Sequence, residues 1–120
     1  MKTVLLIDDE PEMGTLVQAC LRALEAEVEQ VGTAEEAILS AQSHRPRVVL
    51  LDFNLKDDVK GVDILPLLRE ASPLKGVPIV AFTVHGSRRR EAMIRGFDGF
   101  VGKPFSLPAL RSAVEGYLAS

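Results

Sequence analysis

Four apolar runs in this chain end in polar residues whose side chains could act together on a phosphoryl group. Asp52 follows one such run directly. A carboxylate next to a dry core is costly unless a partner compensates its charge. The ends of the other three runs offer Asp8-Asp9, Thr83 and Lys103 as partners. The ends of the four runs therefore supply carboxylates at two places, a hydroxyl group and an amine.

These residue types suit one kind of chemistry. Carboxylates held close together repel unless a proton or a cation lies among them. Hard oxygen ligands with open positions suit Mg²⁺, which binds one or two carboxylates and keeps several waters. Lys103 can pair with a carboxylate or a phosphate, and Thr83 supplies a hydroxyl donor. A carboxylate nucleophile, a divalent metal, an ammonium group and a hydroxyl are the parts required for phosphoryl transfer onto Asp52.

Strand-like runs and helical patterns alternate along the chain, which predicts a parallel sheet covered on both faces, with the polar groups at the strand ends. Strands are predicted at residues 3–7, 28–31, 48–52, 77–82 and 100–102, and helices at 11–24, 33–43, 62–71, 87–96 and 106–118. Right-handed crossovers then favour an α/β doubly wound fold, a five-stranded parallel sheet in the order 2-1-3-4-5 with five helices. Ligands bind outside the carboxyl ends of such strands, so the four polar groups should converge.

Several helix starts carry recognisable signals. Thr33 with Glu36 forms a capping box, and Ser87 and Ser106 are predicted N-caps. Pro66 falls within the third helical pattern. Since proline removes a helical hydrogen bond, the third helix is expected to begin nearer residue 64 or to bend.

The composition is that of one globular domain covering residues 1–120. A net charge of −3 argues against direct nucleic-acid binding through a basic surface. Cys20 is the only cysteine, which excludes an internal disulfide and favours a reducing compartment. No apolar stretch approaches the ~20 residues that span a bilayer, and the first residues do not resemble a signal peptide. We expect a cytoplasmic protein with no membrane contact.

The polar strand ends, taken in order, resemble the receiver domain of bacterial two-component response regulators, which has a flavodoxin-like fold. The resemblance covers essentially the whole chain. Each motif alone is weak, but the set is specific in type, order and approximate spacing. The matching residues are Asp8-Asp9, Leu51-Asp52, Thr83 and Lys103-Pro104-Phe105.

The resemblance implies a role for each residue of the site. Asp52 would accept a phosphoryl group from the phosphohistidine of a histidine kinase or a histidine phosphotransfer protein, as in a phosphorelay. Asp9 would bind Mg²⁺ directly and Asp8 mostly through water. The backbone carbonyl of Asn54 would be a further metal ligand, and Lys103 would contact the phosphoryl oxygens.

The resemblance also implies a switch. Thr83 would move to hydrogen-bond the phosphoryl group, and Phe100 would rotate inward behind it. The surface formed by the fourth helix, the fifth strand and the fifth helix would then change and meet an unknown downstream partner. Such a chain is a signalling receiver rather than an enzyme, since it catalyses only its own phosphorylation and autodephosphorylation. A homodimer is possible.

The resemblance extends to partner docking and to one peptide bond. Met13 and Gly14 lie on the surface of the first helix that partner histidine proteins use in the family, and Pro104 is a further docking candidate. The Lys103–Pro104 bond would be cis, a form that proline tolerates far better than other residues.

The chain departs from the family pattern at four places. The loop from Asp52 to Gly61 is longer than usual, and the stretch from Thr83 to Lys103 is shorter, so the fourth helix or its flanking loops should be trimmed. Val84 replaces the small residue that usually follows the switch hydroxyl. Phe100 lacks the hydroxyl of the common tyrosine, so its switching would depend on burial alone.

Two other functions remain open. A receiver-like adaptor could bind partners constitutively without phosphorylation, although the intact set of acids, Thr83 and Lys103 argues against it. An enzyme on a related sheet is the third reading. An aspartate-nucleophile phosphatase requires a second acid where Asn54 stands, and a flavin carrier requires a phosphate-binding loop where Asp8-Asp9 would repel phosphate in the absence of metal.

Overall fold

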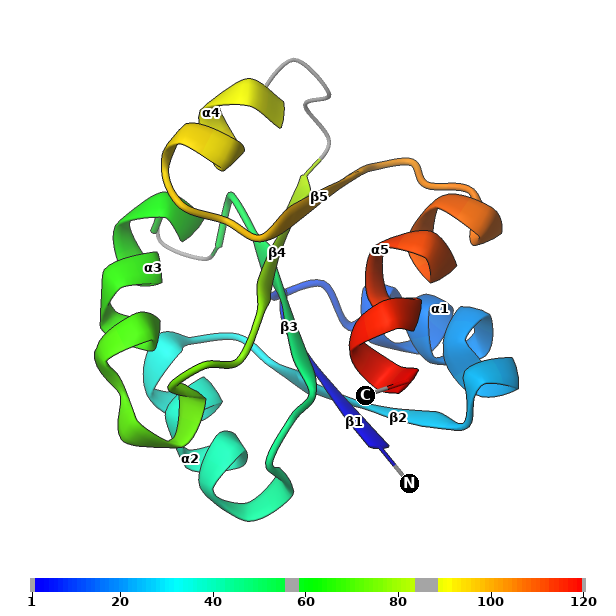
Figure 1. Cartoon of the computed structure of the whole chain (residues 1–120), viewed down its shortest axis with the longest axis horizontal. Helices are drawn as coiled ribbons and strands as arrows, with labels where there is room; N and C mark the ends of the chain where they lie inside the picture. The colour runs from blue at the N-terminus through cyan, green and yellow to red at the C-terminus, as the bar shows by residue number, and fades with distance from the viewer. Residues whose placement is uncertain (1, 56–58, 84–88, 120) are drawn as a thin grey trace.

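The protein is built on one parallel sheet with helices on both faces (Figure 1). The computed structural model describes residues 2–55, 59–83 and 89–119. The strands lie in the order β2-β1-β3-β4-β5, which confirms the predicted topology. They are β1 (Lys2–Ile7), β2 (Ala26–Val31), β3 (Val48–Asp52), β4 (Ile79–Thr83) and β5 (Gly99–Gly102).

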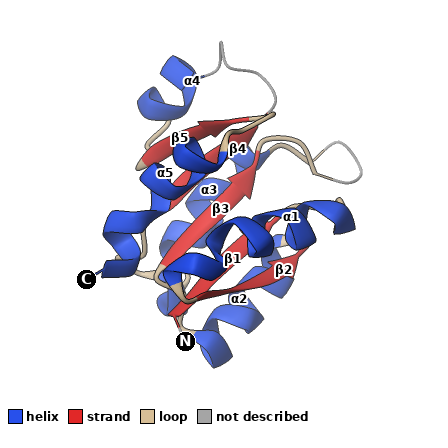
Figure 2. Ribbon diagram, turned by 90° about the vertical axis from the view of Figure 1, so that its right-hand side faces the viewer, coloured by secondary structure: helices blue, strands red, loops and turns tan. Residues whose placement is uncertain are grey.

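The helices divide between the two faces of the sheet, as Figures 1 and 2 show. Helices α2 (Ala34–His44), α3 (Gly61–Glu70) and α4 (Arg89–Ile94) cover one face, and α1 (Pro11–Leu21) and α5 (Leu107–Ala119) cover the other. Two short 3-10 helices, η1 (Arg22–Leu24) and η3 (Ser72–Leu74), follow α1 and α3 in the chain. None of the helices in these described ranges is long and apolar enough to cross a membrane.

The core explains why the sequences of the central strands are unbroken apolar runs. Successive side chains of a strand point to opposite faces, and both faces here are covered. Leu5 and Ile7 of β1 therefore pack with α2 and α3, whereas Val4 and Leu6 pack with α1 and α5. This burial on both sides holds the strand ends in fixed positions at one edge of the sheet.

The predicted boundaries agree with the structure except at a few ends. Strand β2 begins two residues before the predicted residue 28, at Ala26, and β4 begins two residues after the predicted residue 77, at Ile79. The first helix ends at Leu21 and continues only as η1, because Glu25 takes a left-handed conformation with φ of 57°. Helix α4 ends at Ile94, short of the predicted residue 96, and Gly96 has φ of 100°.

Pro66 lies inside α3, and of the two predicted alternatives the start near residue 64 is wrong, whereas a bend stays a prediction. The helix begins at Gly61. Proline cannot donate the backbone bond expected at its position. The buried side chains of Ile64, Leu65 and Leu68 compensate by fixing α3 against the sheet, and tertiary packing of this kind commonly overrides local propensity.

The predicted caps are found where the structure describes them. The Thr33 side chain accepts a hydrogen bond from the Glu36 backbone N–H at 3.1 Å, and the Glu36 carboxylate in return accepts from the Thr33 hydroxyl and the Gly32 N–H. Ser106 accepts from the Ala109 N–H at 3.2 Å. The third predicted cap, Ser87, lies outside the described residues.

Candidate functional site

The polar strand ends meet at one edge of the sheet. The strand register pairs Ile7 with Leu51, Asp52 with Phe82 and Thr83 with Gly102, so the carboxyl ends of the four strands lie level with one another. Asp8, Asp52 and Lys103, which stand far apart in the sequence, are consequently in direct contact.

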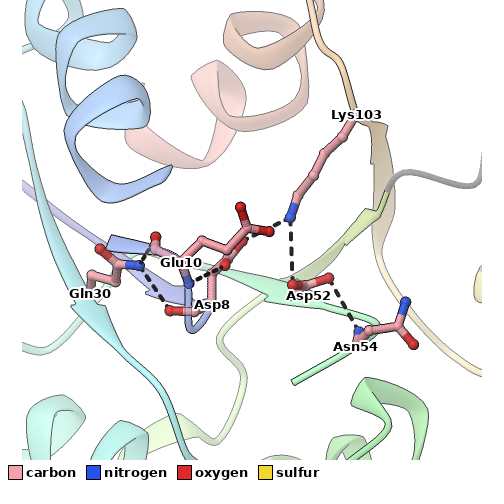
Figure 3. Close-up of polar contacts among 6 residues, drawn as sticks. All are labelled: Asp8, Glu10, Gln30, Asp52, Asn54 and Lys103. Carbon is pink, nitrogen blue, oxygen red and sulfur yellow. Dashed lines mark hydrogen bonds and ion pairs between the residues drawn. The ribbon is translucent and has the colours of Figure 1, made fainter. Parts of the chain in front are cut away.

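Lys103 links two carboxylates at the centre of the site (Figure 3). Its Nζ donates a hydrogen bond to Asp8 Oδ2 at 2.8 Å and lies 3.5 Å from Asp52 Oδ2. All three residues are buried, and the ammonium group also lies 4.6 Å from the centroid of the Phe82 ring. An ammonium group placed between two buried acids compensates charge that would otherwise be costly there.

A third carboxylate completes an acidic cluster. One oxygen from each of Asp8, Asp9 and Asp52 lies within 4.8 Å of the others. Asp9 is only partly buried, so the cluster opens to solvent on its side. Lys103 alone cannot balance three carboxylates, and oxygen ligands with open positions are the set that Mg²⁺ prefers. The residues present fit that ion.

The charge of Asp52 is destabilised by its surroundings. Burial raises the pKa of the Asp52 carboxyl from 3.8 to about 6. The Lys103 ammonium and the backbone N–H of Asn54 act in the opposite direction, and the neighbouring Asp8 adds to the increase. Asp52 is thus an acid held in a position where added positive charge would favour its ionised form.

Gln30 supports the loop that carries the two N-terminal acids. Its side-chain amide donates to the backbone carbonyls of Asp8 at 2.8 Å and Glu10 at 2.7 Å (Figure 3). The Glu10 N–H in turn donates to Asp8 Oδ1 at 2.9 Å. A Cβ on Gly14 would lie 2.0 Å from Gln30 Oε1, so only glycine leaves room for this side chain. The sequence analysis missed Gln30, because a polar residue on a half-exposed strand carries no local signal.

Gly61 supports the loop that follows Asp52. A Cβ at this position would lie 2.2 Å from the Asp52 carbonyl oxygen, and the Gly61 N–H donates to the Phe53 carbonyl at 2.7 Å. The Asn54 N–H donates to Asp52 Oδ1 at 3.2 Å (Figure 3). The sequence analysis gave Gly61 no role; its one signal is a glycine placed where a polar loop meets a helix.

The remaining predicted residues lie around this centre. Thr83 is buried at the end of β4, and its carbonyl accepts from the Lys103 N–H at 2.7 Å. Phe100 is partly buried against the core beneath α3 and α4. Met13 is also partly buried, packed against the core beneath α1 and α5. Pro104 is exposed, and the Lys103–Pro104 bond is cis as the resemblance implies.

Comparison with known proteins agrees with this geometry. The family model of the response regulator receiver domain matches residues 4–115. The probable transcriptional regulatory protein TcrX of Mycobacterium tuberculosis is 36% identical over 107 residues, which cover 88% of this chain and 44% of TcrX. The polar-differentiation response regulator DivK of Brucella anthropi is 27% identical over 119 residues, which cover 98% of this chain and 96% of DivK. The chain thus spans less than half of one relative and nearly all of the other.

One solved structure of the same fold contains a metal ion. The receiver domain of the sensor histidine kinase PA1611 from Pseudomonas aeruginosa aligns with a TM-score of 0.81 and 26% identity, covering 99% of this chain and 98% of that one. That structure has a magnesium ion coordinated in its active site cleft. The similarity therefore includes a protein of the same fold whose cleft holds the ion that the acidic cluster fits.

Proposed function

Because the chain belongs to the response regulator receiver domain family, we propose that it is a phosphoacceptor switch of two-component signalling. Asp52 takes a phosphoryl group from the phosphohistidine of a histidine kinase or a histidine phosphotransfer protein. The observation that carries the proposal is the buried Lys103 ammonium between Asp8 and Asp52, because it places a cation beside the acid that would receive the group.

The transfer exchanges one bond to phosphorus for another. An Asp52 carboxylate oxygen attacks the phosphorus atom, and the bond between phosphorus and the donor's imidazole nitrogen breaks. The electron pair of that bond stays on the nitrogen, and the ring leaves as neutral imidazole when its other nitrogen carries a proton. The product on this chain is an acyl phosphate, which water later hydrolyses to regenerate Asp52.

The chain's own residues prepare Asp52 for this step. The Asn54 N–H and the Lys103 ammonium orient and stabilise its ionised carboxylate. Asp8, Asp9, Asp52 and the carbonyl of Asn54 would hold Mg²⁺, which neutralises charge on the phosphoryl oxygens when bound. Lys103 can pair with a phosphoryl oxygen while it keeps its bond to Asp8.

The switch uses Thr83 and Phe100. The Thr83 hydroxyl donates to the phosphoryl group, and Phe100 moves inward behind it, which changes the surface of α4, β5 and α5. A near-complete switch needs roughly 5.5 kcal/mol of difference between the two states. A charge-assisted bond and a hydroxyl bond of about 1–3 kcal/mol each supply much of this difference. The downstream partner reads the changed surface.

Two further features belong to the proposal. The donor protein docks beside α1, at Met13 and Gly14, and on the β5–α5 loop, at Pro104. The free thiol of Cys20 is compatible with a reducing cytoplasm, which is the location we propose.

Exposure to acetyl phosphate tests the proposal directly. We expect intact-mass spectrometry to detect one phosphoryl adduct when Mg²⁺ is present and none in EDTA. The adduct should disappear in Asp52→Asn and persist in Asp63→Asn, which changes an exposed acid of α3. A wild-type chain that takes no phosphoryl group, although it binds Mg²⁺, would favour the constitutive adaptor instead.

A further inference from the structure

The exposed apolar side chains of the molecule concentrate on one side. Among the described residues, seven large apolar side chains are exposed, and five of them belong to α2, α3, α4 and the loop before α3. Exposed apolar side chains that gather on one face mark interaction surfaces more reliably than scattered ones do. These five are Leu39, Val59, Leu67, Met93 and Ile94.

A groove runs between α2 and α3 on this side. It consists of two adjoining hollows that share Ala34, Glu35 and Leu67, and the more enclosed one has a volume of about 230 Å³. Leu67 is 55% exposed. Two exposed acids, Glu35 and Glu70, also line the hollows. We call this the α2–α3 groove; its apolar lining is Ala34, Ile38, Leu55, Val59, Ile64 and Leu67.

Helix α4 presents the opposite charge on the same side. Ala92 is buried against the sheet, and residues two positions before and after it point to the far side of the helix, which places Arg90 and Ile94 outward. Ile94 is 75% exposed and Met93 is 48% exposed. We call the exposed residues of this helix, together with the residue that follows it, the α4 ridge; they are Arg89, Arg90, Met93, Ile94 and Arg95.

The groove and the ridge lie on either side of α3. Figure 1 shows α2, α3 and α4 in a row along one face of the sheet. The groove joins α3 to α2, and on the other flank the Arg69 side chain donates to the Gly96 carbonyl just beyond α4, at 2.8 Å. The described residues contain no ion pair that engages Glu35, Glu70 or Arg90, so these charges remain available to a partner.

We propose that two copies of this chain associate face to face, with the α4 ridge of each copy in the α2–α3 groove of the other. The twofold axis then passes over α3. Each copy supplies both halves of the contact, so the pair closes and does not extend into a filament. The aliphatic side chains of Met93 and Ile94 enter the apolar groove, and the arginines pair with Glu35 and Glu70.

The complementarity of the groove and the ridge favours a second copy of the chain as the occupant. A basic ridge with an aliphatic tip and an acidic groove with an aliphatic floor occur on the same face of the same chain. Association with another copy buries both surfaces at once and matches their charges. The contact is argued from the residues of the groove and the ridge alone, none of which belongs to the acidic cluster.

Sedimentation equilibrium over a range of protein concentrations tests the apolar part of the contact. We expect a reversible dimer for the wild type. Ile94→Ser and Leu67→Ser should each weaken it by about tenfold, since each removes a buried aliphatic contact. Leu16→Ser is the matched control, because Leu16 is 50% exposed but lies on α1 at the other face. All three sites are exposed, so the variants should stay folded.

Exchange of charges tests the pairing itself. Glu35→Arg/Glu70→Arg and Arg90→Glu/Arg95→Glu should each be monomeric alone, because groove and ridge then carry the same sign. An equal mixture of the two variants should dimerise again, since both contacts become complementary. Glu27→Arg/Glu115→Arg changes the net charge as much as the first variant but on β2 and α5, and should dimerise like the wild type.

Three results would overturn the proposal. The first is a wild type that stays monomeric at every accessible concentration. The second is a dimer that Ile94→Ser and Leu67→Ser leave as tight as that of the Leu16→Ser control. The third is a mixture of the two charge variants that remains monomeric, while circular dichroism shows both to be folded.

Discussion

At the scale of single residues, the site brings together charged side chains whose burial destabilises the folded chain. Asp52 sits beside Asp8 in a mostly dry position, and burial raises its pKa to about 6. Lys103 reduces this cost without removing it. An acid kept partly uncompensated is well suited to receive a cation and then a phosphoryl group.

Replacing the charge of Asp52 should stabilise the metal-free protein. The folded chain binds the Asp52 proton more tightly than the unfolded chain does, so folding loses stability as pH rises from about 4 to 6 and does not regain it above 6. Asp52→Asn avoids this loss. In EDTA at pH 7.5 we expect its free energy of unfolding to exceed that of the wild type by about 1–3 kcal/mol.

Urea unfolding at several pH values measures this effect. The advantage of Asp52→Asn should shrink steadily below pH 6, because the wild-type carboxyl is then protonated. Asp63→Asn, at an exposed position, should show no such pH-dependent gain. An Asp52→Asn protein less stable than the wild type at pH 7.5 would show that burial does not dominate at this site.

At the scale of elements, two glycines let loops approach the site closely. Gly14 on α1 leaves room for Gln30 of β2, which holds the carbonyls of Asp8 and Glu10. Gly61 begins α3 directly against the backbone of Asp52. Each glycine joins a helix to a strand end, so each helps to set the position of a carboxylate.

Gly61→Ala should disturb the loop that carries Asp52. The added Cβ meets backbone atoms, which cannot move aside as a flexible side chain can. We expect a destabilisation of about 1–3 kcal/mol and slower phosphorylation by acetyl phosphate.

Gly116→Ala is the matched control for this prediction. A Cβ at Gly116 meets nothing within 4 Å, and the residue lies in the interior of α5. This variant should gain about 0.5–1 kcal/mol because alanine favours a helix. The thermal unfolding and the phosphorylation rate of both variants test this prediction. If the two variants are equally stable and equally fast, the approach of Gly61 to Asp52 has no effect on the site.

Gly14→Ala and Gln30→Ala should weaken Mg²⁺ binding through the same contact. The alanine Cβ at position 14 displaces the Gln30 amide, and the second change removes that amide. Either change frees the loop that carries Asp8 and Asp9. Isothermal titration with Mg²⁺ should give two similar losses, with the double variant no weaker than either single one. Additive losses would place the two residues in separate roles.

At the scale of the whole molecule, the sheet connects the site to a distant surface. Thr83 and Lys103 stand at the ends of β4 and β5, and the backbone N–H of Lys103 bonds to the Thr83 carbonyl. Strand β5 leads from α4 on one face to α5 on the other. A change at these strand ends can therefore reach both faces of the molecule.

Hydrogen exchange should detect this change. With acetyl phosphate and Mg²⁺ we expect altered protection of α4, β5 and the start of α5, and little change in α2. Thr83→Ala should still accept the phosphoryl group, as intact mass will show, yet lose most of the altered protection, because the hydroxyl contact that favours the active state is missing. Unchanged protection in the phosphorylated wild type would contradict the proposed switch.

The framework of this protein could be predicted from its residues alone. Apolar runs alternating with helical patterns predict a covered parallel sheet, because a strand buried on both faces must be apolar throughout, and right-handed crossovers favour the observed strand order. A polar residue at the end of such a run, as at Asp52, Thr83 and Lys103, stands out against that pattern. These residues consequently identified both the edge of the sheet and its chemistry.

The contacts among those groups follow from packing between distant parts of the chain. The bond between Lys103 and Asp8 joins residues 95 positions apart, and the close approaches of Gly61 to Asp52 and of Gly14 to Gln30 depend on how a helix packs on a strand. The raised pKa of Asp52 follows from burial. Local patterns of residue type record which face of an element is buried, but distances and dielectric surroundings arise only when the elements pack together.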